Sequence, residues 1–322
     1  MKDGRRIDDA AKPMADIIAA KGDPIKTGDY PTYDNPMDFA ARTFLGTTKY
    51  SDQFSSYNYF TPGSGKGIMK QFYNREPRFY LAITFQNRRW DFDAANTYYT
   101  DMAFNGNSGS DGKTHDYPIF GTICRKLYYG KESNVDASVM IRLGEVYLNY
   151  AEACCELGDL KTAIEYVNKI RSRAGIAEYA FDDDTQTKDA RGLTKIKLSS
   201  FGTVDQSLVR KVVYRERLIE LAFESKHYFD VRRWGVADMA QGDGWVYPTY
   251  HKGGEGGDMI GFNVNNEGTD TEKTNTLNFY KRVTAQHRIF TKRMSLFPIP
   301  QDEVNRNANI VQNTGWGTDT EE

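Results

Sequence analysis

The sequence lacks the long apolar run that a membrane-spanning helix requires. No stretch of about 18 apolar residues occurs among its 322 residues. The opening segment, Met1 to Arg6, is not followed by the apolar core of a secretory signal. Charge of one sign is missing too, because 42 basic side chains balance 44 acidic ones. This balance gives no reason to expect a nucleic-acid partner.

Signatures of catalysis and of cofactor binding are also absent. The sequence contains no His-Glu-x-x-His zinc motif, no Gly-x-Ser-x-Gly nucleophile motif and no Gly-x-x-x-x-Gly-Lys-Ser/Thr phosphate loop. The four histidines (His115, His227, His251 and His287) are dispersed, which argues against a histidine-rich metal site. These absences give no motif-based reason to expect an enzyme, a cofactor or a metal site; calcium in the loops is left open.

Cysteines are few, and we expect all three to be packing residues. Cys154 and Cys155 are adjacent in a helical pattern, so their side chains diverge, and with Cys124 they make an odd number. An odd set of three cannot all pair. We interpret them as small apolar side chains of the core rather than as redox or metal sites.

Aromatic residues, in contrast, are plentiful, with 21 Tyr, 18 Phe and 4 Trp. Many lie in polar stretches rich in Gly, Asn and Ser, away from amphipathic helices. Residues 30–67 are such a stretch, with the composition of a loop. Aromatic rings in polar loops favour recognition of a ligand at the surface.

The strongest periodic signal is helical. A first block runs from about Ala137 to Ala174 and breaks at residues 157–159, in the manner of a tetratricopeptide helix pair. Small Ala151 and Ala163 allow the two helices to approach closely. A second block, residues 207–235, repeats apolar residues at helical spacing, and it needs another helical face to cover it.

Other predicted elements are shorter. Residues 1–21 predict one amphipathic helix. Residues 78–90 are β-branched and aromatic enough to predict a short strand. Residues 236–288 are loop-like, with five residues rich in glycine at their centre, and predict a long surface excursion.

Charged residues on the helical blocks are interpreted as ion pairs between packed helices rather than as catalytic groups, since helix surfaces are where such pairs form. The residues are Arg142, Glu145, Arg171, Arg173, Glu216, Arg217, Glu220 and Glu224.

Several segments, in order along the chain, resemble the SusD/RagB family. The most specific are Ile141–Ala153 with Val167–Gly175, and Glu216–Glu224 with Tyr228–Gly235. Further similar segments are Met1–Arg5, Asn74–Tyr80, Phe297–Val304 and Asn307–Trp316. The sequence departs from the family at Glu76, where Asp is usual, at Ala308 and Thr314, where Pro is usual, and at Trp316, where Tyr is usual.

The resemblance implies a mainly α protein, with tetratricopeptide-like helix pairs in a SusD-like α-superhelix, long loops and a few short strands. It implies one SusD-like region over residues 1–322: a loop-rich, ligand-facing part (1–136), a helical core (137–235), and a loop excursion with a closing segment (236–322). Family members are longer and begin with a lipoprotein signal, so we expect the sequence to be a C-terminal portion.

For function, the resemblance implies capture of a nutrient at the surface of the bacterial outer membrane, as in polysaccharide utilization by Bacteroidetes. The ligand would be a glycan, expected as an oligosaccharide that is bound without catalysis, and the partner a SusC-like TonB-dependent transporter. The N-terminal lipid anchor that this role requires is absent from the sequence. Two alternatives remain open: a peptide-binding or protein-binding member of the family, and a generic tetratricopeptide scaffold for protein interactions.

The resemblance also implies a glycan site made of loop aromatics, because the flat C–H faces of sugars pack on aromatic rings while polar groups orient the hydroxyls. The candidates are Trp90, Tyr57, Tyr59, Tyr73, Tyr98 and Tyr99, with Arg88 and Asp91 as polar company. Trp90 is the first choice, and the alternative is that it caps the core beneath a strand. A second aromatic set, Trp245, Tyr247 and Tyr250, is a candidate for lining the site or for contacting the transporter, and neither role is chosen.

Overall fold

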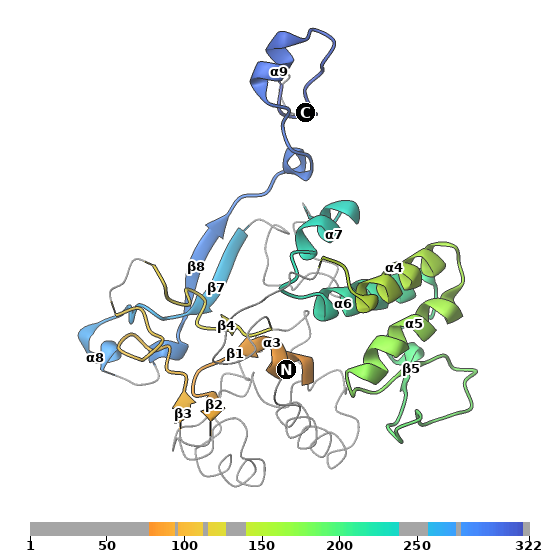
Figure 1. Cartoon of the computed structure of the whole chain (residues 1–322), viewed down its shortest axis with the longest axis horizontal. Coiled ribbons are helices and arrows are strands. Elements are labelled where there is room, and N and C mark those ends of the chain that lie inside the picture. Colours follow the sequence, from red (N-terminus) through yellow and green to blue (C-terminus); the bar gives the residue numbers. More distant parts are fainter. Residues whose placement is uncertain are drawn as a thin grey trace.

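The molecule has a helical side and a strand-and-loop side, and a C-terminal arm extends from the second of these (Figure 1). The computed structural model describes residues 77–93, 96–111, 115–126, 140–237, 257–274 and 278–317. Within these ranges no helix is long and apolar enough to cross a membrane. The predicted mainly helical fold, with a few short strands, is confirmed.

The first predicted block forms a helix pair. α4 (Leu143–Glu156) and α5 (Leu160–Arg173) are joined by a turn at Gly158, whose φ of 84° is open to glycine without steric cost. Asp159 is the N-cap of α5, and its carboxylate accepts a hydrogen bond from the Thr162 backbone N–H at 3.2 Å. The predicted break at residues 157–159 is therefore confirmed.

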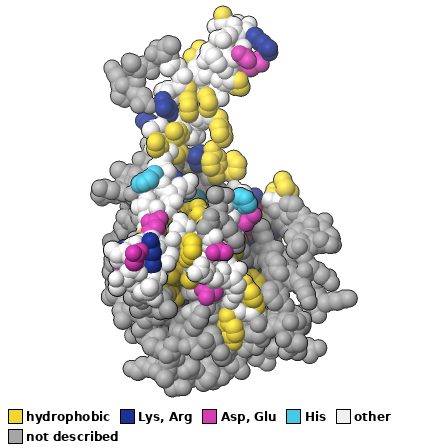
Figure 2. All heavy atoms as spheres, turned by 90° about the vertical axis from the view of Figure 1, so that its left-hand side faces the viewer, with side chains coloured by type: hydrophobic (Ala, Val, Ile, Leu, Met, Phe, Trp, Pro, Cys, Tyr) yellow, Lys and Arg dark blue, Asp and Glu magenta, His cyan; other side chains and the backbone are white. Residues whose placement is uncertain are grey.

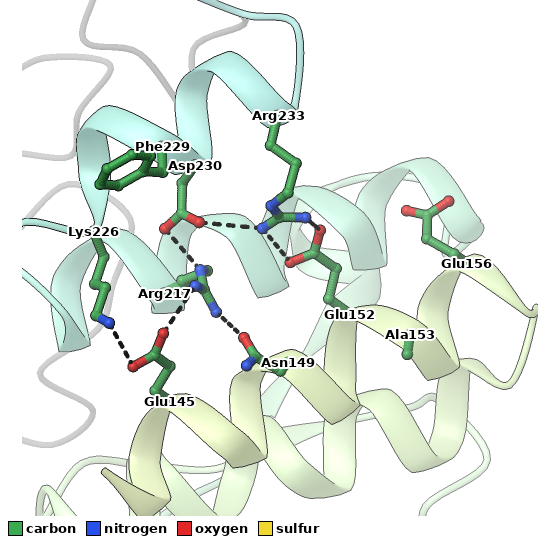
Figure 3. Close-up of a pocket in the computed structure, with 10 residues that line it drawn as sticks. All are labelled: Glu145, Asn149, Glu152, Ala153, Glu156, Arg217, Lys226, Phe229, Asp230 and Arg233. Atoms are coloured by element: carbon green, nitrogen blue, oxygen red, sulfur yellow. Dashed lines mark hydrogen bonds and ion pairs between the residues drawn. The ribbon is translucent and has the colours of Figure 1, made fainter. Parts of the chain in front are cut away.

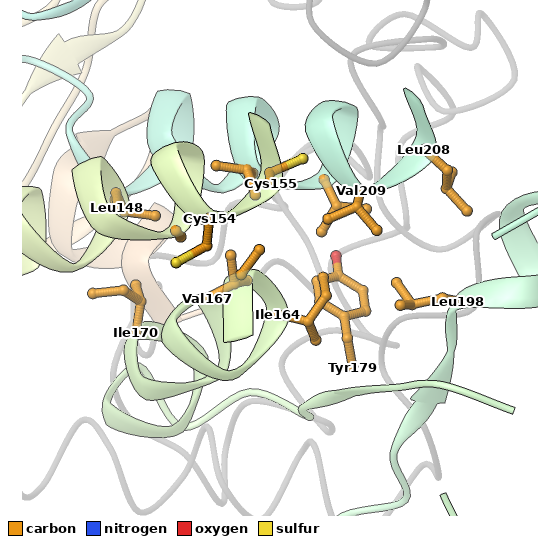
Figure 4. Packing of buried hydrophobic residues seen from close by; sticks show 14 of the residues in the cluster. Leu148, Cys154, Cys155, Ile164, Val167, Ile170, Tyr179, Leu198, Leu208 and Val209 are labelled. Atoms are coloured by element: carbon orange, nitrogen blue, oxygen red, sulfur yellow. The ribbon is translucent and has the colours of Figure 1, made fainter. Parts of the chain in front are cut away.

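α6 (Gln206–Glu220) covers the apolar side of this pair. Val209 of α6, Leu148 of α4 and Val167 of α5 are each 0% exposed. Figure 4 shows these side chains within one cluster of buried residues. Full burial of such a side chain stabilises the fold by about 1.5–3 kcal/mol. The expectation that the second block needs another helical face is confirmed, and α4 and α5 supply that face.

The second block is interrupted after α6. Phe223 and Ser225 adopt φ angles of 64° and 59°, which a right-handed helix does not use. α7 (His227–Arg233) begins after them. Trp234 follows α7 and stacks on Tyr214 of α6, with 3.9 Å between the ring centroids. This contact packs the end of α7 against α6.

Two buried glutamates of α6 join the surrounding segments. The carboxylate of Glu216, which is 2% exposed, accepts hydrogen bonds from Arg78 at 2.6 Å and from Arg171 at 3.1 Å. Glu220, at 3% exposure, accepts from Arg78 at 3.1 Å and from Arg142 at 2.6 Å. Burial raises the pKa of Glu216, but the charges of Arg78 and Arg171 outweigh burial, so this pKa lies below its ordinary value.

The remaining predicted charges are paired as well. Arg173 pairs with Glu220, and Glu224 pairs with Arg142 at 2.7 Å. Arg217 pairs with Asp230 at 2.7 Å, and Glu145 with Lys226 at 3.0 Å. The interpretation of these helical charges as ion pairs is confirmed. Such buried pairs fix the arrangement of the helices, because loss of either partner leaves an uncompensated charge inside the protein.

The strand-and-loop side begins with a helix. α3 (Pro77–Ala82) starts at a proline, which suits the first helical turn because it has no N–H to leave unpaired. β1 (Ile83–Thr84) follows and pairs antiparallel with β4 (Ile123–Cys124). The strand predicted over residues 78–90 is thus wrong in its first part, since Pro77 directs the chain into a helix.

The region after residue 256 was predicted as a loop excursion, but it contains a β-ladder. β7 (Gly257–Phe262) and β8 (Arg282–Arg288) pair antiparallel, with an irregularity between Met259 and Ile260. Between them lie α8 (Asp270–Lys273) and η5 (Asn278–Tyr280). Glycines in β7 weaken its strand propensity, so the long-range pairing with β8 decides its conformation.

Two smaller features complete the body. β5 (Tyr179–Ala180) and β6 (Ile196–Lys197) pair in parallel between α5 and α6, and η4 (Leu198–Phe201) follows them.

The C-terminal arm contains η6 (Lys292–Ser295) and α9 (Gln301–Arg306). The Trp316 indole N–H donates to the carbonyls of Arg293 at 2.8 Å and Leu296 at 3.1 Å, which closes the arm on itself. The ring of Phe297 stacks on Tyr228 with centroids 6.1 Å apart. Figure 2 shows hydrophobic side chains gathered along this arm.

The cysteine prediction holds for two of three residues. Cys154 and Cys155 are buried in the helical core, and burial raises the pKa of the Cys155 thiol to about 11. Cys124 is exposed, so its predicted place in the core is wrong. The strand β4 has two residues, and Ile123 is the more buried of them while Cys124 points to the other side.

Apolar side chains also lie on the outer face of α4. Leu143, Val146, Tyr150 and Leu157 are 62%, 47%, 48% and 86% exposed. Their spacing of three, four and seven residues puts them along one face of the helix. The helix is therefore apolar on two faces, one packed in the core and one at the surface.

Candidate functional site

The candidate ligand surface is a β-hairpin that carries two of the predicted aromatics on one face. β2 (Arg89–Asp93) pairs antiparallel with β3 (Asn96–Tyr99), with a bulge between Asp91 and Asp93. Trp90 lies directly opposite Tyr98 in this ladder. Residues paired directly across a ladder share one face of the sheet, so these two rings are neighbours.

Trp90 is half-buried, and a cation contacts its ring. The guanidinium carbon of Arg125 lies 4.7 Å from the ring centroid, in the geometry of a cation–π interaction. Arg125 follows β4, and its backbone N–H donates to the Ala82 carbonyl at 2.7 Å. Sequence reasoning did not select Arg125, because a pairing of β1 with β4 brings it to the hairpin and no local pattern indicates that pairing.

Tyr98 and Tyr99 are both half-buried, but they lie on opposite faces of β3, because side chains alternate along a strand. The hydroxyl of Tyr98 is 3.1 Å from that of Ser108, so the hairpin face is joined to the loop after β3. The carbonyl of Tyr99 accepts a hydrogen bond from the Asn107 side-chain amide at 2.8 Å. One face of the hairpin therefore carries Trp90 and Tyr98 without Tyr99.

Arg88 differs from the other candidates because it faces the interior. It is 1% exposed, and its guanidinium donates to the Ile83 carbonyl at 2.6 Å. The same group lies 5.8 Å from the ring centroid of Phe85. In this position Arg88 supports the chain between β1 and β2 from within.

Of the other candidates, only Asp91 lies in the described residues, and it belongs to the hairpin itself. Asp91 lies opposite Thr97 in the β2–β3 ladder, and its side chain is not among those that the structure describes. The candidates Tyr57, Tyr59 and Tyr73 lie outside the described residues, as does the second aromatic set, Trp245, Tyr247 and Tyr250.

A hollow with a volume of about 610 Å³ lies between α4, α6 and α7 (Figure 3). Its walls are charged, and the charges pair with one another except that of Glu156, which pairs with Arg210. Arg217 donates to Asp230 at 2.7 Å and to Asn149 at 2.5 Å. Arg233 donates to Glu152 at 2.9 Å and to Asp230 at 3.1 Å. These pairs join α4, α6 and α7, so the hollow is explained as part of the scaffold.

Metal ligands do not cluster in the described parts of the chain. No group of three or more His, Cys, Asp or Glu side chains is placed there to hold an ion. Trp90 and Tyr98, on one face of the β2–β3 hairpin, form an arrangement that is suited to contact with a ligand.

The class of protein that this fold defines is one built on a tetratricopeptide-like helical scaffold. The SusD family model matches residues 1–316, and the chain belongs to this family.

Relatives agree with this assignment. The chain is similar to the SusD-like protein P25 of Formosa agariphila, with 36% identity over 102 residues, which cover 31% of the chain and 16% of that protein. Its fold is similar to that of BT4246, with a TM-score of 0.56 and 26% identity over 77% of the chain. A SusD-like protein of Bacteroides fragilis, BF3747, shares the fold at a TM-score of 0.54, with 23% identity over 77% of the chain.

The chain spans only part of these relatives. The matches to BT4246 and BF3747 cover 38% and 40% of those proteins.

Proposed function

We propose that the protein captures an oligosaccharide nutrient and delivers it without altering it chemically. The observation that supports this most is the pairing of Trp90 and Tyr98 on one face of the β2–β3 hairpin, in a chain of the SusD family. Sugar rings pack their C–H faces on such aromatic surfaces. Arg125, stacked on Trp90, adds a guanidinium whose N–H groups are hydrogen-bond donors for hydroxyls at the same place.

We further propose that the full-length protein works at the cell surface, held in the outer membrane by an N-terminal lipid, beside a SusC-like TonB-dependent transporter. Family membership is the support for this setting. A protein that performs no chemistry must release its ligand intact, so moderate affinity suits this role better than very tight binding.

Calorimetric titration of the chain against plant, host and microbial oligosaccharides tests the proposal. For a sugar that binds, Trp90→Ala and Tyr98→Ala should each weaken binding about tenfold, which corresponds to about 1.4 kcal/mol. Tyr99→Ala is the matched control, because Tyr99 lies on the other face of the same strand. Equal losses in the Tyr98 and Tyr99 variants would show that the hairpin face is not the binding surface.

The absence of catalysis has its own test. After long incubation with a bound oligosaccharide, chromatography should recover the sugar at its original length. Shorter products that disappear when the sample is heat-denatured would contradict capture without chemistry.

A second candidate, capture of a peptide or protein, is favoured by one observation. The exposed stripe of Leu143, Val146, Tyr150 and Leu157 on α4 has the spacing with which one helix packs on another. For this candidate, Val146→Asp should abolish binding of an amphipathic helical peptide, measured by fluorescence anisotropy, and leave binding of sugars unchanged. Glu165→Asp, on the exposed surface of α5, is the control.

A further inference from the structure

A smaller pocket lies on the strand-and-loop side, away from the helical hollow. It has a volume of about 260 Å³ and is formed between the loop after β3 and the segment that leads from β7 into α8. This volume is below the roughly 300–1,000 Å³ of pockets that hold drug-sized ligands. The side chains that matter here are those of Asp101, Phe104, Asn105, Lys273, Thr274 and Phe279.

The first wall is fixed by its own backbone. In the loop after β3, the Ser108 N–H donates to the Asp101 carbonyl at 2.8 Å, and the Asp111 N–H donates to the Phe104 carbonyl at 2.8 Å. Gly106 is required by close packing, because a Cβ there would lie 2.2 Å from the Asp101 carbonyl oxygen. The loop therefore presents Phe104 and Asn105 from a closed frame.

The second wall is fixed by side-chain amides. Asn263, which is 1% exposed, bonds to both the N–H and the carbonyl of Glu267 at 2.7 Å. The amide of Asn266 donates to the Lys273 carbonyl at 3.2 Å. The Ser110 hydroxyl donates to the Val264 carbonyl at 2.9 Å and so ties the two walls together. A pocket built in this way needs little ordering when a ligand enters.

The interior combines an apolar floor with a polar rim. Phe279, at 4% exposure, is held by stacking on Phe262 with 5.2 Å between ring centroids. On the rim, Asn105 is exposed and its amide bonds to no other group in the described part of the chain. The Thr274 hydroxyl donates to the Thr271 carbonyl at 2.8 Å, which leaves its oxygen able to accept.

The pocket is lined by one acidic residue, Asp101, and one basic residue, Lys273, so its charges balance. The ammonium of Lys273 is 3.9 Å from the carboxylate of Asp270, a loose pair at the surface, and it supplies donors to the rim. The carboxylate of Asp101 supplies acceptors, and it already accepts from the Gln86 amide at 2.6 Å. Donors and acceptors around an apolar floor match a ring with hydroxyls on its edge and C–H groups on its face.

We propose that this pocket binds one neutral sugar unit, with Asn105, Lys273 and Thr274 on its hydroxyls and Phe104 and Phe279 on its C–H face. The inference rests on the proposed function, because it adds a position for one unit of the captured oligosaccharide. The loop that forms the first wall also contacts the hairpin, through the hydroxyls of Ser108 and Tyr98. The pocket and the Trp90 surface then belong to one extended site.

Saturation-transfer NMR with methyl glycosides of common neutral sugars tests the pocket directly, since one sugar unit binds too weakly for most other methods. At least one glycoside should bind. Asn105→Ala should weaken that binding at least fivefold, and Thr274→Trp, which fills the pocket from its exposed edge, should abolish it. The matched controls are Asn265→Ala and Thr271→Trp, which alter exposed residues of the same wall that do not line the pocket.

Trp90→Ala separates this inference from the proposed function. It should leave binding of the single glycoside unchanged while weakening binding of the oligosaccharide. Oligosaccharide binding that is lost in Trp90→Ala but unaffected by Thr274→Trp would overturn the pocket and keep the function. Glycoside binding that survives Thr274→Trp, or a pocket that takes only uronic acids, would overturn the inference. If methyl glycosides bind at the pocket but no oligosaccharide binds, the pocket stands and the proposed function fails.

Discussion

The helical side (α4 to α7) and the strand-and-loop side (residues 77–126 and 257–288) are held together by different means. On the helical side, apolar residues at helical spacing form one core, and arginine–glutamate pairs such as Arg171–Glu216 join the helices. On the other side, side chains bond to backbone groups, as Ser110 does to Val264. The first arrangement depends on residue type over long stretches, and the second depends on a few individual residues.

This difference bears on where ligand recognition can vary. A core of interdigitated helices tolerates little change in volume or charge. A loop whose backbone is fixed by hydrogen bonds can exchange an exposed side chain such as Asn105 without loss of its frame. The candidate sugar contacts lie on the strand-and-loop side, where such exchange is possible.

The largest effect that separates the two sides is expected for Glu216→Gln. Removal of this charge takes one buried carboxylate away from Arg78 and Arg171, and the free energy of unfolding should fall by about 3–5 kcal/mol. Urea denaturation followed by circular dichroism at 222 nm, where helices dominate the signal, measures it. Glu165→Gln, in an exposed pair with Lys169, is the control and should change stability by less than about 0.5 kcal/mol. Equal effects in both variants would contradict the role of the buried pair.

A second effect is acid sensitivity of the helical side. The folded-state pKa of Glu216 lies below its ordinary value of 4.5, so its contribution to stability is present above that value and is lost as pH falls through the lower, folded pKa. The urea concentration at the midpoint of unfolding should therefore be constant near neutral pH and should fall below about pH 4.5. The decline should be shallower in Glu216→Gln, and an identical pH profile in that variant would assign the acid sensitivity to other groups.

A smaller effect, confined to the strand-and-loop side, is expected for Gly106→Ala. The added methyl group meets the Asp101 carbonyl, so the loop must shift, at a cost of about 1–3 kcal/mol. Hydrogen exchange should speed up at the Ser108 and Asp111 amides while amides of α6 stay protected. Gly192→Ala is a useful comparison, since a Cβ there meets open space and only its φ of 82° opposes the change. Loss of protection in α6 would show that the two sides unfold together.

The smallest effect is expected at a helix cap. Asp205→Ala removes the acceptor for the Leu208 N–H at the start of α6 and should lower stability by about 1 kcal/mol. Asp205→Asn keeps an acceptor at this position and should retain most of the stability in thermal unfolding. If Asn and Ala destabilise equally, the cap contributes through charge rather than through the hydrogen bond.

The sequence was most informative where structure is local. The helix pair was predictable from apolar spacing together with the Gly158–Asp159 break, since both signals lie within the segment they describe. The ion pairs of Glu216 and Glu220 were predictable in kind, because charges on buried helical faces need partners, but Arg78 was not assigned as one. Its position depends on α3, which Pro77 begins where a strand was predicted.

The candidate site was less predictable. Trp90 and Tyr98 were chosen as aromatics in a polar region, but only the register of β2 with β3 puts them on one face and Tyr99 on the other. Arg88 was chosen for its charge, but it lies in the interior, where its guanidinium donates a hydrogen bond to the Ile83 carbonyl. The small pocket left no periodic signal, since its walls are built from amide and hydroxyl contacts between segments remote in sequence.

The pairing of Arg78 with Glu216 also has a consequence for the order in which the protein folds. The two residues are 138 positions apart in sequence, whereas α4 and α5 are neighbours. During synthesis from the N-terminus, α4 and α5 can pair before α6 is made, but Arg78 must wait for the carboxylates of α6. Ser110 waits longer still, because Val264 is 154 positions away. The α4–α5 pair is therefore synthesised before the residues that fix the loops of the strand-and-loop side.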